Sequence, residues 1–157
     1  MDRPSRWVLM AYRLPREPST PRISLWRELR RLGVAQIADG VVALPLDART
    51  RERFDWLAEE VVENGGEATV WLAEPGSRAQ ERALAAQMAA MIAANYARVI
   101  HEASDRMDEP HTVRRRATAR LRRELRRISS RDHFPGAIAE RAHAAVEALG
   151  DTLEAAS

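Results

Sequence analysis

The sequence contains no cysteine and no lysine. Without cysteine there is no disulfide framework, no thiol nucleophile and no thiolate metal site. Without lysine there is no amine that could form a Schiff base, so lysine-dependent covalent chemistry is excluded. All 25 basic side chains are arginine, whose planar fork suits carboxylate, phosphate and other oxyanions.

Long apolar runs and the common catalytic motifs are also missing. No window approaches the roughly 18–20 apolar residues that span a bilayer, and the first residues lack the apolar stretch of a signal peptide. We therefore expect a cytoplasmic protein that does not bind membranes. There is no phosphate-binding glycine loop and no nucleophile-elbow motif. The four histidines lack metal-ligand spacing, so we expect no enzyme activity, no catalytic residues, no metal and no cofactor.

The 157 residues are 45% hydrophobic, which suits one domain or a small domain with an appendage. The charge is uneven along the chain. Residues 1–75 carry 11 arginines against 12 acids, and residues 76–157 carry 14 arginines against 11 acids. The overall charge of +2 does not by itself indicate a nucleic-acid binder.

Residues 7–33 predict a buried strand followed by a helix. The strand, 7–13, is apolar on both alternating faces and should therefore be central in a sheet. Thr20 is suited to the N-cap of the helix with Pro21 at its first position, and Gly33 is suited to end it. We expect Trp26 to face the sheet together with its apolar helical neighbours.

The following residues complete a split β-α-β arrangement. Asp39-Gly40 between apolar runs predicts a tight hairpin, Asp47 predicts the cap of a second helix, and residues 67–73 predict a fourth strand. The order βαββαβ indicates an α+β, ferredoxin-like antiparallel sheet with both helices on one face. Its central strands are apolar on both faces, so C-terminal helices or a second subunit must cover the other face. We expect a homodimer.

A three-helix C-terminal extension follows the Glu74-Pro75-Gly76 boundary. Ser77 and Gln80 suit a capping box for a long first helix, and Asp108 suits the cap of the second. The third helix begins near Pro135. The predicted organisation is residues 1–75 as the ferredoxin-like domain and residues 76–157 as a helical extension packed on it, together forming one structural unit.

The strongest electrostatic feature is the second of these helices, Val113–Ile128. Apolar residues share one side of it, arginines cover the opposite arc, and Glu124 is its only acid. Such a cluster can follow the phosphate backbone of DNA. Alternatively, the arginines pair with acids elsewhere, such as the acidic 55–63 segment, and the chain is a non-catalytic protein-interaction module. The candidate DNA- or anion-binding residues are Arg115, Arg116, Arg122, Arg123, Arg126 and Arg127, with Arg27, Arg30 and Arg31 of the first helix.

Many short segments occur in an order typical of one known family. They are Trp7-Val8-Leu9, Tyr12-Arg13-Leu14-Pro15-Arg16-Glu17-Pro18-Ser19, Trp26-Arg27, Leu29-Arg30-Arg31-Leu32-Gly33, Asp39-Gly40-Val41, Leu44-Pro45, Trp56-Leu57, Gly65-Gly66-Glu67-Ala68 and Val70-Trp71, and more thinly Arg120-Leu121-Arg122-Arg123 and Arg131-Asp132-His133-Phe134-Pro135-Gly136. With these segments the chain resembles the N-terminal domain of the chromate-resistance regulator ChrB.

The resemblance implies a chromate-responsive transcriptional regulator that binds DNA, with chromate or another oxyanion as the candidate ligand to be sensed. Arginine forks near a helix N-terminus suit a tetrahedral dianion. Full-length regulators of this kind carry a second, C-terminal domain that these 157 residues do not match. A more distant likeness is to the ferredoxin-like domain of the CRISPR adaptation endonuclease, which needs an acid at the end of its first strand. Arg13 stands near that place here, which disfavours nuclease activity.

Overall fold

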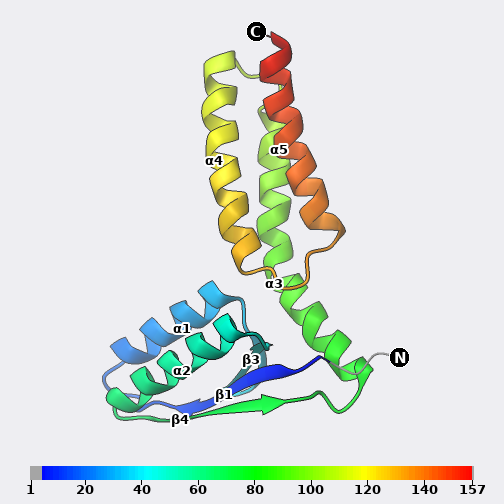
Figure 1. The fold of residues 1–157 in the computed structure, drawn as a ribbon. Coiled ribbons are helices and arrows are strands. Elements are labelled where there is room, and N and C mark those ends of the chain that lie inside the picture. The colour runs from blue at the N-terminus through cyan, green and yellow to red at the C-terminus, as the bar shows by residue number, and fades with distance from the viewer. Residues whose placement is uncertain (1–4, 157) are drawn as a thin grey trace. The chain divides into compact units, whose positions relative to one another are not determined.

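A computed structural model describes the backbone of residues 5–156 and the side chains of residues 5–151. The chain forms two compact units, residues 1–88 and residues 89–157 (Figure 1). The sequence-based boundary after residue 75 falls between β4 and α3, and the first turns of α3 stay with the first unit. The elements are β1 (Trp7–Arg13), α1 (Thr20–Leu32), β2 (Ala35–Ala38), β3 (Val41–Pro45), α2 (Ala48–Glu63), β4 (Glu67–Ala73), α3 (Arg78–Asp105), α4 (His111–Ser130) and α5 (Ala137–Ala156).

The first unit has the ferredoxin-like fold. Its antiparallel sheet has the strand order β2-β3-β1-β4, and α1 and α2 lie on one face of it (Figure 1). β1 is central, as its two apolar faces predicted. The α+β order βαββαβ followed by three helices is confirmed.

The turns form where the sequence signals lie. Gly33 ends α1 with φ 73°, and Gly40 turns the β2–β3 hairpin with the same angle, a backbone conformation that favours glycine. Asp47 caps α2: its carboxylate accepts the Thr50 N–H at 2.8 Å, and the Thr50 hydroxyl accepts the Asp47 N–H at 3.0 Å. These three predictions are confirmed, whereas the N-cap of α1 is Ser19 and not Thr20 as predicted.

The core of the first unit lies between the sheet and the two helices. Val8 and Met10 of β1 are fully buried, as is Phe54 of α2. α1 contributes Leu25 and Leu29. Trp26 was expected in this core, which is wrong: its side chain is 57% exposed. The buried side of α1 is narrower than the apolar spacing indicated, because the two leucines already fill the contact with the sheet.

The other face of the sheet is covered in part by the first turns of α3. Glu81 accepts hydrogen bonds from the Trp7 indole N–H at 3.2 Å and from the Ser5 backbone N–H at 2.9 Å. Trp7 is 1% exposed as a result. Toward β4 the same face keeps exposed apolar surface, since Trp71 is 59% exposed.

The second unit is a helical core built from the end of α3 with α4 and α5. Tyr96 is 1% exposed, and its hydroxyl donates to Asp132 at 2.7 Å across the α4–α5 connection. Burial, followed by that hydrogen bond, raises the pKa of Tyr96 to about 12. Asp108 does not cap α4, contrary to prediction: Pro110 holds the N-cap position and makes no side-chain cap bond.

α3 is long and apolar enough, by length and composition alone, to cross a membrane. This property was not predicted, because α3 has no long uninterrupted run of large apolar residues and alanine supplies much of its apolarity. The core helices of soluble proteins pass the same test. Ile92, Tyr96 and Val99 are buried in the core of the second unit, but only 22% of the most apolar 18-residue segment of α3 is buried.

Candidate functional site

α4 presents an apolar side to the core of the second unit and an arginine-rich side to solvent. Leu121 is 1% exposed and Ile128 is fully buried, and Ala117 and Leu125 complete the buried side. The periodicity of about 3.6 residues per turn separates these residues from the arginines, as the sequence predicted. The helix is therefore held from one side only.

Two of the predicted binding residues of α4, and also Arg120, which was not among them, form ion pairs. Arg120 bonds Glu102 of α3, Arg122 lies 3.5 Å from Glu147 of α5, and Arg127 lies 3.7 Å from Glu124 of α4 itself. These pairs are at the surface, where an ion pair contributes about 0–1 kcal/mol. They neutralise the two margins of the arginine-rich side.

Four arginines between those margins have no partner. Arg115, Arg116, Arg123 and Arg126 are exposed, and none makes an ion pair or hydrogen bond within the described part of the chain. At 3.6 residues per turn they fall within about 100° of arc and along about 16 Å of helix. We call these four residues the arginine stripe.

Arg114 is different, and the sequence did not single it out. It is 8% exposed, and its Nε donates to the Glu109 carbonyl at 3.0 Å, while its Nη1 is buried without a partner. It ties the start of α4 to the preceding loop. Its neighbours in the run of three arginines look identical in sequence, and only the helix register distinguishes them.

The arginines predicted on α1 belong to the first unit and differ in their surroundings. Arg31 pairs with Glu28 on the same helix, and the Arg30 guanidinium lies 4.8 Å from the centre of the Trp26 ring, a cation–π contact. Arg27 is exposed and makes no bond among the residues described. α1 thus offers one unpaired cation of the three.

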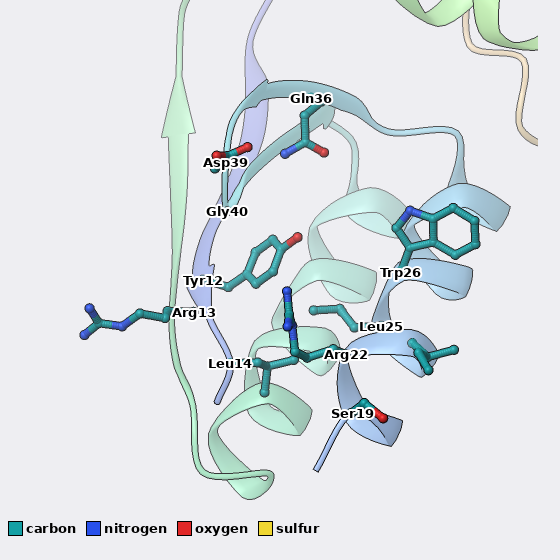
Figure 2. Close-up of a pocket in the computed structure, with 11 residues that line it drawn as sticks. Tyr12, Arg13, Leu14, Ser19, Arg22, Leu25, Trp26, Gln36, Asp39 and Gly40 are labelled. Carbon is teal, nitrogen blue, oxygen red and sulfur yellow. The ribbon is translucent and has the colours of Figure 1, made fainter. Parts of the chain in front are cut away.

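A pocket of about 830 Å³ lies in the first unit beside the start of α1. Figure 2 shows Tyr12 and Arg22 entering it from β1 and α1, with Trp26 on the α1 side and Asp39 at the β2–β3 hairpin. Its size is in the range of small-molecule sites. The lining residues are Tyr12, Arg13, Leu14, Ser19, Arg22, Ile23, Leu25, Trp26, Gln36, Asp39 and Gly40.

The polar side chains that line this pocket do not hydrogen-bond or ion-pair with one another in the described residues. The Tyr12 hydroxyl, the Arg22 guanidinium and the Asp39 carboxylate make no hydrogen bond or ion pair in the described residues. Burial raises the pKa of Tyr12; the Arg22 charge opposes the rise and the Asp39 charge adds to it. This site was not predicted: neither Tyr12 nor Arg22 was a candidate site residue, and Asp39 was explained by turn geometry alone.

Across residues 5–151 no three histidine, cysteine or acidic side chains come together to hold a metal ion. His101 lies 3.1 Å from Asp105 on the exposed side of α3, as an isolated pair.

The family described as "Protein ChrB, N-terminal" matches residues 22–111, which is more than half of the chain. No curated protein and no solved structure matches it. The matched residues include Arg22, Trp26 and Asp39 of the pocket. They end at His111, where α4 begins, so the arginine stripe and the likeness seen in the tail lie beyond them. The chain therefore belongs to the ChrB N-terminal family.

Proposed function

We propose that the chain is a non-enzymatic, cytoplasmic transcriptional regulator that binds DNA through the arginine stripe of α4. Membership of the ChrB N-terminal family links it to chromate resistance. The observation that carries the DNA proposal is the stripe itself: four exposed arginines without acidic partners on a helix whose other side is buried.

The stripe has the form of a phosphate-binding surface. Its length of about 16 Å exceeds the roughly 12 Å width of the major groove. Arginines that neutralise phosphates release condensed counterions. The logarithm of the DNA-binding constant therefore falls with the logarithm of the salt concentration, with a slope of about 0.9 for each phosphate neutralised. Arg122 and Arg127, with longer ion pairs at 3.5 and 3.7 Å, can join the contact at the margins.

A gel-shift titration at several salt concentrations tests this proposal. The probe is the DNA upstream of the protein's own gene, with a scrambled fragment for comparison. Arg123→Ala plus Arg126→Ala is expected to weaken binding roughly tenfold at 0.1 M salt and to reduce the salt slope by about 2. Both residues are exposed, so the fold should be unaffected.

Arg49→Ala plus Arg53→Ala is the matched control, because it removes the same charge from exposed positions of α2 in the first unit. For this control, the slope of the logarithm of the DNA-binding constant against the logarithm of the salt concentration should stay within about 0.5 of the parent value. The proposal is overturned if the parent protein does not bind DNA at low salt, or if both double variants lose affinity equally. That outcome favours the alternative, a protein-interaction module whose α4 arginines are held by Glu102, Glu147 and Glu124.

As a second part of the proposal, the pocket beside α1 binds an oxyanion such as chromate through Arg22. The Arg22 guanidinium is unpaired, the first turn of α1 contains no acid, and the Ser19 hydroxyl makes no cap bond. Free N–H groups at a helix start favour anions. Asp39 disfavours an anion at its own end of the pocket, so the ligand occupies the Arg22 end.

Isothermal titration with chromate, and separately with sulfate, tests this part. Arg22→Ala is expected to weaken the binding of the anion at least about tenfold, because a charge-assisted, bidentate hydrogen-bonding contact is lost. Asp39→Asn should strengthen it severalfold by removing a negative charge. Arg49→Ala on α2 is the control for net charge. Equal affinity of the parent and Arg22→Ala proteins for both anions would refute the assignment and leave the DNA proposal intact.

A further inference from the structure

The pocket beside α1 is larger than a free oxyanion needs. Its volume is about 830 Å³. A water molecule takes about 30 Å³ of liquid, and a tetrahedral oxyanion is only a few times larger. An ion bound at Arg22 would therefore leave most of the pocket to solvent. Pockets of about 300–1,000 Å³ usually hold organic ligands of the size of a nucleotide or a drug.

The hairpin end of the pocket offers side-chain groups that accept hydrogen bonds. The Asp39 carboxylate has no partner in the described residues. Gln36 also lines this end, and its Nε2 donates to the Ala38 carbonyl at 2.6 Å. The free atom of that amide is therefore its oxygen, Oε1. A carboxylate and an amide oxygen together disfavour an anion and favour a ligand group that carries N–H donors.

The α1 end of the pocket has the opposite polarity, since Arg22 is its unpaired charge. Figure 2 shows Arg22 and Asp39 on opposite sides of the Tyr12 ring. Both charges act on the Tyr12 hydroxyl, so the two ends belong to one site. A ligand that fills the pocket therefore needs an anionic group at one end and N–H donors at the other.

An exposed apolar wall lies along the α1 side of the same pocket. Trp26 is 57% exposed and Ile23 is 48% exposed, and both line the pocket. The Arg30 guanidinium lies over the Trp26 ring, yet more than half of this side chain remains open. Aromatic side chains stack with planar rings, and every nucleobase has a face that stacks on them. The middle of the ligand is therefore expected to be a planar ring system.

We propose that the pocket beside α1 binds a guanine nucleoside monophosphate. Its phosphate binds Arg22, its ring lies on Trp26, and its N1–H and 2-amino groups donate to the two oxygens of Asp39. Guanine is the common base that carries two adjacent N–H donors on one edge, and these match the two oxygens of a carboxylate. The inference rests on the anion site proposed above, because the phosphate takes the place of the free oxyanion at Arg22.

Isothermal titration of the full chain with guanosine monophosphate (GMP), inosine monophosphate (IMP) and sulfate tests the assignment. The parent protein should bind GMP at least about tenfold more tightly than sulfate and than IMP, which lacks the 2-amino donor. Asp39→Asn should weaken GMP binding at least about tenfold and remove the preference over IMP, because an amide offers one acceptor in place of two. The same substitution should strengthen sulfate binding, since it removes a negative charge.

Trp26→Ala should weaken GMP binding about tenfold and leave sulfate binding unchanged, because only the nucleotide has a ring to stack. Asp55→Asn and Trp56→Ala, at exposed positions of α2, are the matched controls and should change neither affinity. The proposal is overturned if the parent protein binds GMP no more tightly than sulfate, or if Asp39→Asn strengthens the binding of both ligands. The sulfate titration of the parent protein decides the anion site at Arg22 separately. No titration contains DNA, so the DNA proposal is tested independently.

Discussion

Replacing Phe54 by alanine is expected to lower the free energy of unfolding of the first unit by about 3–5 kcal/mol. The Phe54 ring is fully buried between α2 and the sheet, where Val8, Met10 and Leu44 are also fully buried. Close-packed neighbours cannot collapse into the space of a whole ring, so the loss includes a cavity term in addition to the lost burial. Such a change is a large part of the roughly 5–15 kcal/mol that stabilises an ordinary domain.

Trp56→Ala is the matched control, since this larger aromatic residue lies two positions along the same helix and is 59% exposed. Its replacement should change the free energy of unfolding by less than about 1 kcal/mol. Urea unfolding followed by tryptophan fluorescence measures both variants. All four tryptophans lie in the first unit, so the signal does not report on α4 and α5. If Trp56→Ala proves as harmful as Phe54→Ala, the assigned orientation of α2 is incorrect.

Gly66→Ala is expected to destabilise the first unit by about 1–3 kcal/mol or more. A methyl group at Gly66 would lie 2.3 Å from the Arg13 carbonyl oxygen and 2.9 Å from a Val61 methyl. The Arg13 carbonyl lies at the end of β1, where Arg13 pairs with Glu67 of β4, so it cannot move without disturbing that pairing. The substitution therefore opens the sheet at the start of β4.

The control for this prediction is Gly136→Ala, where the added methyl has no atom within 4 Å. It should leave the unfolding free energy unchanged or slightly higher, because alanine restricts the unfolded chain more than glycine does. Urea unfolding monitored by circular dichroism covers both positions. An equal loss in the two variants would show that the close approach of β1 to Gly66 is absent in solution.

The fold was predictable because its signals are local. The hairpin at Asp39-Gly40, the end of α1 at Gly33 and the cap at Asp47 each depend on a few adjacent residues. The two-faced apolarity of residues 7–13 likewise identified the central strand. The start of α4 was misjudged because Asp108 and Pro110 both suit a helix start, and sequence alone could not rank them.

The candidate sites were less accessible to sequence reasoning, because they depend on which side chains meet. Arg120 and Arg123 are alike in sequence, yet only Arg120 meets an acid, Glu102 of α3. The pocket joins Tyr12, Arg22 and Asp39 from three separate elements, and no spacing rule connects them. Trp26 looked like a core residue because it shares a side of α1 with apolar neighbours. Helical periodicity shows which residues share a side of a helix, but it does not show how much of that side the sheet covers.

The Gln87 amide bears on whether this sheet can be extended by other chains. A sheet with two receptive edges can add copies indefinitely and give a fibre, because each added copy presents a new edge. Gln87 hydrogen-bonds both backbone groups of Gln36 at the β2 edge, so a strand cannot pair there without displacing it. Loss of this side chain would therefore matter less for stability than for solubility at high concentration.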